Sequence, residues 1–230
     1  MAERVRLPRW IWLWFPPLLA VIVFATRLAD PAFYDRYIEG EHALVELATP
    51  VVALCGFVVG LTMLGMLREL PSRAMRAWVV LITLACLYLG GEELSWGQQL
   101  FQWETPTAIE QLNDQRETNL HNMSSWFDQK PRLLLELWVL IGGVIVPLRR
   151  RWSRRTSNKV FWKWFWPAWE CFPTALLAIL IKLPERYRDV AGAGSLPFEI
   201  RWSEPQEYYF ALFMLIYLLA VRARLRARTG

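Results

Sequence analysis

The stretch AWVVLITLACLYLGGEELSWGQQ, residues 77–99, decides the fold. Residues 77–89 form an apolar run that supplies most of the roughly 20 residues a helix needs to cross a bilayer. Two adjacent carboxylates, Glu92 and Glu93, follow this run. Because hydrocarbon cannot solvate charge, ionisable groups at such a depth usually mark a functional site. The stretch therefore predicts a transmembrane helix that ends in a polar site.

The rest of the chain has the composition of a membrane protein. Hydrophobic residues make up 55% of the 230 residues, and 14 residues are tryptophan, which membrane proteins place at the lipid–water boundary. We expect an all-α polytopic membrane bundle of about six transmembrane helices that forms a single integral membrane domain over residues 1–230. The six apolar segments long enough to span are residues 10–26, 44–67, 77–97, 133–148, 164–182 and 207–222.

The distribution of charge predicts the orientation of these helices. Seventeen of the 26 Lys and Arg residues fall in the two terminal tails and in the second and fourth loops, where the acids are only Glu3 and Glu69. By the positive-inside rule this side is cytoplasmic, so both termini are predicted to lie inside. The basic residues are scattered over four short segments, which argues against nucleic-acid binding and favours the lipid bilayer as the partner. The predicted location is a bacterial inner membrane; the sequence names no protein partner.

A second polar segment, ETNLHN at residues 117–122, supplies one of the two histidines of the chain. The predicted topology places Glu117 and His121 in an outer loop, beside several acids at the outer ends of the helices. We therefore predict a polar site that opens to the outer, periplasmic face. Its expected members are Glu46, Glu92, Glu93, Ser95, Gln98, Glu117, Asn119, His121 and Asn122.

The local geometry of the doubled glutamates limits how they can act together. Adjacent residues on a helix point roughly 100° apart, so Glu92 and Glu93 can face one centre only if the helix unwinds there. Glycines at positions 90, 91 and 97 would permit such a break. Acids near helix ends can also be merely solvated, and Glu204 and Glu207 are expected to be so.

Three chemical uses fit these residue types. A divalent metal ion of unknown identity could be bound by Glu46, Glu93, Glu117 and His121, and could activate water. Without a metal, close carboxylates can serve as general acid and base, with Glu92, Glu93, Ser95 and His121 as catalytic candidates. Gln98, Asn119 and Asn122 would then support the site. Third, carboxylates in a membrane can relay protons or bind a transported cation.

The leading functional prediction is a membrane-embedded hydrolase or transferase that acts on a lipid or lipid-linked substrate at the outer face. A proton- or cation-coupled transporter or channel is the first alternative, and it requires a polar path that continues inward past Glu170. A non-enzymatic subunit of a membrane complex is the second, with the acids paired to arginines such as Arg116, Arg132 or Arg201. The sequence separates these three functions poorly.

Two resemblances bear on the same motifs. The segments GEELSWGQ (residues 91–98) and ETNLHN (residues 117–122), with the acidic entry at residues 39–46, resemble a group of bacterial and archaeal multi-pass membrane proteins. That resemblance implies the membrane fold and no particular activity. Glu92-Glu93 is also similar to the start of the first motif of CAAX-type intramembrane proteases. There the pair is followed by an arginine where this chain has Gly97, and of their later histidine motifs only His121 remains.

Overall fold

The structure, a computed structural model, describes residues 7–39, 43–105, 125–153, 160–192 and 200–229. Within these ranges the chain is helical, with no strand, and six helical segments are long and apolar enough to cross a membrane. The predicted all-α polytopic bundle is confirmed, and the protein is a multi-pass membrane protein. The spans are Trp10–Ala29, Leu44–Leu61, Arg73–Glu93, Gln129–Trp152, Val160–Ala191 and Ser203–Arg228.

Each span consists of one helix or of several consecutive shorter ones. In chain order the elements are η1 (Trp10–Trp14), α1 (Phe15–Ala29), α2 (Pro31–Tyr37), α3 (Leu44–Leu61), η2 (Leu64–Glu69), α4 (Arg73–Glu93), η3 (Ser95–Gly97), α5 (Gln98–Phe101), α7 (Ser125–Trp138), η4 (Val139–Ile145), α8 (Val146–Ser153), α9 (Val160–Phe165), η5 (Trp169–Cys171), α10 (Phe172–Leu180), α11 (Leu183–Ala191) and α12 (Ser203–Thr229).

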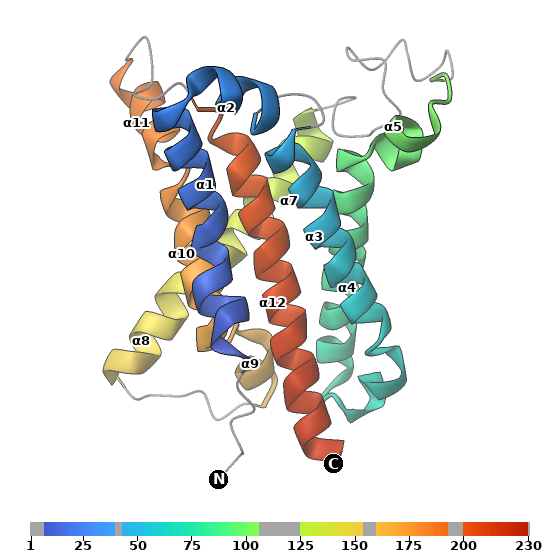
Figure 1. The fold of residues 1–230 in the computed structure, drawn as a ribbon. Coiled ribbons are helices and arrows are strands. Elements are labelled where there is room, and N and C mark those ends of the chain that lie inside the picture. Colours follow the sequence, from blue (N-terminus) through green and yellow to red (C-terminus); the bar gives the residue numbers. More distant parts are fainter. Residues whose placement is uncertain (1–6, 40–42, 106–124, 154–159, 193–199, 230) are drawn as a thin grey trace.

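The chain ends lie together at one end of the bundle, and α2 and α5 lie at the other (Figure 1). We call the end with the termini the inner end, following the charge-based prediction of orientation, and the opposite end the outer end. This arrangement places the start of α3, the end of α4 and the starts of α7 and α12 at the outer end.

The last helix, α12, is the centre of the bundle. Of its spanning window, 72% is buried inside the protein, against 17–39% for the other five spans in the described ranges. It packs mainly against α3 and α10 and also contacts α4 and α1 (Figure 1). Its segment from Tyr208 to Leu218 is apolar all round, as expected for a helix with neighbours on every side.

Small residues bring α3 and α4 close together. A Cβ atom on Gly60 would overlap the Thr83 side chain, and one on Gly56 would lie 2.8 Å from Cys86 Sγ. Close approach at small residues is the usual basis of helix packing in membranes, where lipid provides no hydrophobic drive between helices. Gly56 and Gly60 permit this contact, whereas Gly65 has open space around its Cβ position.

Proline residues interrupt the fifth span. Helix α9 ends at Phe165, just before Pro167, and α10 begins at Phe172 with Pro173 in its first turn. Proline lacks the N–H that a helix interior requires but is tolerated in the first turn. The short α9 thereby turns back towards α4, which it contacts.

We predict that Gly60→Ala lowers stability while Gly65→Ala does not. The added methyl at position 60 meets Thr83, whose rotamer is held by a 2.8 Å hydrogen bond from Oγ1 to the Val79 carbonyl oxygen. Overpacking of this kind costs about 1–3 kcal/mol. The midpoint of thermal unfolding in detergent measures the effect. Equal midpoints for the two variants would show that the α3–α4 contact is not limiting.

Candidate functional site

Helix α4 unwinds directly after the doubled glutamates. It is regular through Gly90 and Gly91 and ends at Glu93, and the next residues adopt positive φ angles of 46° at Ser95, 54° at Trp96 and 100° at Gly97. The predicted break therefore occurs, but after the glutamates rather than at Gly90 and Gly91. Non-glycine residues in this conformation store strain, which is commonest at functional sites.

The turn folds Trp96 back onto α4 and orients Glu92. A Cβ atom on Gly91 would lie 2.9 Å from the Trp96 ring, so glycine is needed for this approach. Trp96 Nε1 donates a 2.6 Å hydrogen bond to Glu92 Oε1, and Glu92 is only 3% exposed. Glu92 is thereby tied to the turn that follows it, and Glu93 is the member of the pair that meets the other helices.

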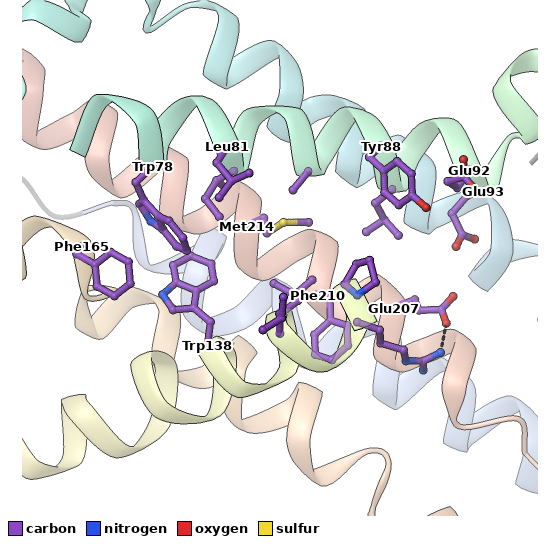
Figure 2. A pocket seen from close by; sticks show the side chains of 17 residues that line it. Trp78, Leu81, Tyr88, Glu92, Glu93, Trp138, Phe165, Glu207, Phe210 and Met214 are labelled. Carbon is purple, nitrogen blue, oxygen red and sulfur yellow. Dashed lines mark hydrogen bonds and ion pairs between the residues drawn. The ribbon is translucent and has the colours of Figure 1, made fainter. Parts of the chain in front are cut away.

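A groove of about 500 Å³ runs between α4, α7, α9 and α12 (Figure 2). It extends along α4 from Trp78 to Glu93, which is about 22 Å at ~1.5 Å per residue. Its ionisable lining groups, Glu92, Glu93, Arg132 and Glu207, gather at the outer end. The other lining residues are Trp78, Leu81, Ile82, Ala85, Tyr88, Leu89, Pro131, Leu134, Leu135, Trp138, Phe165, Phe210 and Met214.

Two carboxyl groups meet at the outer end of the groove. Glu207 from α12 lies close to Glu93 from α4, and Glu46 and Glu204 are also near enough to act on Glu93 electrostatically. Figure 2 shows Glu93 and Glu207 on opposite sides of this end. Two neighbouring carboxyl groups are suited to acid–base chemistry, because the charge of one favours the neutral form of the other.

Arg132 of α7 connects this pair to the rest of the bundle. Its Nη1 donates a 2.6 Å hydrogen bond to Glu207 Oε1, and its Nη2 donates a 3.1 Å bond to Gln206 Oε1. Gln206 in turn donates from Nε2 to the carbonyl oxygen of Ala178 on α10, at 3.2 Å. These bonds hold Glu207 in position and tie α7, α12 and α10 together at the level of the carboxyl pair.

A second polar cluster fixes α2 over the outer end of α12. The Tyr34 hydroxyl donates a 2.5 Å hydrogen bond to Glu39 Oε2, and the Arg201 side chain lies 3.4 Å from Glu39 Oε1 and 3.5 Å from Glu204 Oε1. Burial of Tyr34, followed by its bond to Glu39, raises the pKa of its hydroxyl well above the usual value. This cluster holds the outer cap of the bundle and does not line the groove.

The structure brings together part of the predicted site. Glu46, Glu92 and Glu93 lie at the outer end of the groove or beside it. Ser95 is buried in the turn, and Gln98 donates from Nε2 to Thr105 Oγ1 at 2.8 Å and to the Trp103 carbonyl oxygen at 3.2 Å, so its amide holds the segment after the turn. Four predicted members lie outside the described residues: Glu117, Asn119, His121 and Asn122.

The sequence analysis did not place Glu207 or Arg132 in the site. Glu207 was expected to be merely solvated, and this expectation is wrong because α12 is central and carries Glu207 into the groove. Arg132 was considered only as a partner for buried acids, and it does pair with one. The sequence feature that could have identified both residues is their position at the outer ends of predicted spans.

A metal centre remains a prediction. Within the described ranges, no three His, Cys, Asp or Glu side chains are grouped closely enough to hold a metal ion. The predicted ligands Glu46 and Glu93 are near one another, while His121 and Glu117 fall outside those ranges. The carboxyl pair by itself is suited to proton transfer.

Comparison with known proteins does not assign a family. No protein-family model, no curated protein and no solved structure matches the chain. The two resemblances drawn from the sequence motifs therefore stay predictions, and the functional argument rests on the residues of the groove.

We predict that Arg132→Gln destabilises the protein more than Arg186→Gln. Removing Arg132 leaves Glu207 without its cation in a partly buried position, which costs about 1–3 kcal/mol. The Arg186 side chain is 45% exposed, against 26% for Arg132. Arg186 pairs only with Glu136 among the described residues, whereas Arg132 also bonds Gln206, so we expect a loss under about 1 kcal/mol for Arg186. Thermal unfolding of the two variants gives the comparison, and equal losses would contradict the anchoring role of Arg132.

We also predict that Tyr34 makes the protein less stable at alkaline pH. Because the pKa of Tyr34 is raised in the folded protein, the unfolded chain loses this proton first, near pH 10, and stability falls as the pH rises further. Tyr34→Phe should cost about 1 kcal/mol at neutral pH and flatten the decline above pH 10. Unfolding midpoints from pH 7 to 11 test this, with Tyr37→Phe on the same helix as the control. An unchanged slope in Tyr34→Phe would count against it.

Proposed function

We propose that this protein is a membrane-embedded hydrolase or transferase for a lipid or lipid-linked substrate, located in a bacterial inner membrane. The observation that carries the proposal is a pair of neighbouring carboxyl groups, Glu93 and Glu207, at the polar end of an otherwise apolar groove. Exposed leucines of α4 and α7, Leu81 and Leu134, form part of the lining. A lipid chain can therefore enter sideways from the bilayer.

In the proposed reaction, Glu207, whose carboxylate accepts a hydrogen bond from Arg132, acts as the general base, and Glu93 acts as the general acid. The deprotonated member accepts the proton of an attacking water or hydroxyl group, and the protonated member donates its proton to the leaving oxygen. The pair ends the reaction with the same number of protons as it began. The reaction therefore needs no proton from bulk water, which suits a site with little water. Arg132 holds Glu207 in place and supplies positive charge near oxygen atoms that become negative in the transition state.

His121 and Glu117, which lie outside the described residues, keep their predicted roles in this proposal. His121 and Glu117 would join the site from the outer loop, as metal ligands or as a further acid–base group. A divalent metal there would activate the attacking water. The Glu93–Glu207 pair does not require it, so the two versions of the proposal differ in their sensitivity to a chelator.

A transporter and a structural subunit are the two alternative functions, and each makes its own prediction. A transporter needs a polar path towards the inner end, and the described lining of the groove becomes apolar inward of the carboxyl pair, with Glu170 not among the lining residues. A structural subunit would use the acids only in ion pairs, as Arg132–Glu207 and Arg201–Glu39 are used. Proton-driven solute flux in vesicles would favour the first, and a stable co-purifying protein the second.

We predict that Glu93→Gln and Glu207→Gln each lower lipid turnover by about 10²–10⁴-fold, the usual contribution of a general acid or base. Glutamine keeps the size and polarity of glutamate but cannot exchange the proton. Lipid profiles of cells, together with turnover by the purified protein in vesicles, provide the measurement. Glu104→Gln, at an exposed acid of the same end, is the control and should behave as wild type. Unchanged turnover in both groove variants would remove the proposal.

A further inference from the structure

Three arginines from two helices meet at the short helix α9, at the inner end of the bundle (Figure 1). Arg150 of α8 donates from Nη2 to the carbonyl oxygen of Trp162 at 3.3 Å, and Arg224 of α12 donates from Nη1 to that of Lys163 at 3.4 Å. Because these carbonyls are consecutive, the two guanidinium groups lie near enough to act on each other electrostatically. Arg228 follows Arg224 by four residues and shares its face of α12. We call Arg150, Arg224 and Arg228 the inner arginine cluster.

The contacts that hold this cluster are uncharged. The two carbonyl oxygens belong to the last turn of α9, where side-chain cations often bond the free carbonyls of a helix end. Arg228 lies over the ring of Trp164, with its Cζ 4.7 Å from the ring centroid. These contacts place the three guanidinium groups and leave their positive charge in place.

No carboxylate in the described part of the chain forms an ion pair with an arginine of the cluster. Glu170 is in the neighbourhood, since it and Arg224 both act electrostatically on Cys171, but it is not within ion-pair distance of Arg224. Like charges one helical turn apart destabilise a helix, and the third arginine adds to the repulsion. An anion between the guanidinium groups would remove this cost.

The free donors of the cluster match a phosphate group. A guanidinium carries five N–H donors in a planar fork, and Arg150 and Arg224 each use one of them for the α9 carbonyls. The remaining donors can make paired hydrogen bonds to phosphate oxygens, which is the geometry that arginine provides better than lysine.

The cluster lies at the depth of lipid head groups. Trp152, two residues after Arg150 on α8, is exposed, and so are Trp162 of α9 and Trp169 of η5. Exposed tryptophans at the end of transmembrane spans mark the lipid–water boundary. Basic sites between transmembrane helices on the cytoplasmic side are suited to anionic lipid head groups, and the charge distribution predicts that this end is cytoplasmic.

We propose that the inner arginine cluster binds the phosphate of an anionic phospholipid from the leaflet at the inner end. Arg150 and Arg224 donate to the phosphate oxygens, and Arg228 adds positive charge beside them. The bound lipid thereby connects α8 to α12 across the end of α9. The site lies at the opposite end of the bundle from Glu93 and Glu207, and it does not depend on the proposed reaction.

The first test uses the wild-type protein. The full chain, purified in detergent, is offered equal amounts of phosphatidylglycerol and phosphatidylcholine with identical acyl chains, and bound lipid is measured by native mass spectrometry. We expect phosphatidylglycerol to be retained about tenfold more, the order expected for two arginines beside an anionic lipid. Equal retention, or a preference for phosphatidylcholine, would overturn the inference.

Matched variants then separate this site from the general charge of the inner end. The double variant Arg150→Gln/Arg224→Gln should lower the preference to about twofold or less, because both phosphate donors are removed. Arg68→Gln/Arg73→Gln removes the same charge from two exposed arginines of the inner end and should keep the wild-type preference. Equal losses in the two double variants would show that only the total charge matters, and the site would be withdrawn.

The folding of the variants is checked by their unfolding midpoints. If the midpoint of Arg150→Gln/Arg224→Gln has collapsed, Arg228→Gln decides, because Arg228 is exposed and makes no hydrogen bond in the described structure. This variant should lower the preference by about threefold, against no change for Arg73→Gln alone. An unchanged preference in Arg228→Gln would then count against the cluster.

A last comparison distinguishes a lipid phosphate from a soluble one. The unfolding midpoint of lipid-depleted protein is measured with phosphatidylglycerol and, separately, with inorganic phosphate at the same concentration. We expect phosphatidylglycerol to raise the midpoint and inorganic phosphate to leave it unchanged. An equal rise with inorganic phosphate would assign the cluster to a soluble anion and overturn the lipid assignment, and no rise with either would overturn the site.

Discussion

The bonds of Arg132 to Glu207 and Gln206 are the interaction on which the outer half of the bundle depends. They join α7 to the start of α12, and Gln206 extends them to α10. Charged groups at this depth are expensive unless they are paired. The same bonds hold Glu207 beside Glu93 at the end of the groove, so structure and proposed chemistry share one set of contacts.

The motif GGEELSWGQ can be explained residue by residue from the turn at the end of α4. Gly91 leaves room for the Trp96 ring, and Trp96 donates to Glu92. Gly97 continues the left-handed backbone that begins at Ser95. The two glutamates therefore have different surroundings: Glu92 is bonded to the turn, and Glu93 faces Glu207 at the end of the groove (Figure 2). Adjacent residues on a helix point in different directions, and the structure uses both directions.

The positions of the polar groups in the structure bear more directly on the possible functions than the sequence alone does. Ionisable groups of the groove gather at one end, and the described lining inward of them is apolar. A groove of this kind fits an amphiphile with its head at the membrane surface better than a permeating solute, and this supports the proposed lipid substrate. The aromatic closure by Trp78, Trp138 and Phe165 limits how far a chain can reach towards the inner end.

The sequence by itself determined the all-α class, the six spans and the gathering of acids at the outer ends of helices. These follow from local properties: apolar length and charge distribution. Only the tertiary structure decided that α12 is central, because all six spans are apolar and composition does not distinguish a lipid neighbour from a protein neighbour. That central position turned Glu207 from an expected surface acid into the partner of Arg132 and the neighbour of Glu93, since the direction of a side chain across a bundle depends on which helices face each other.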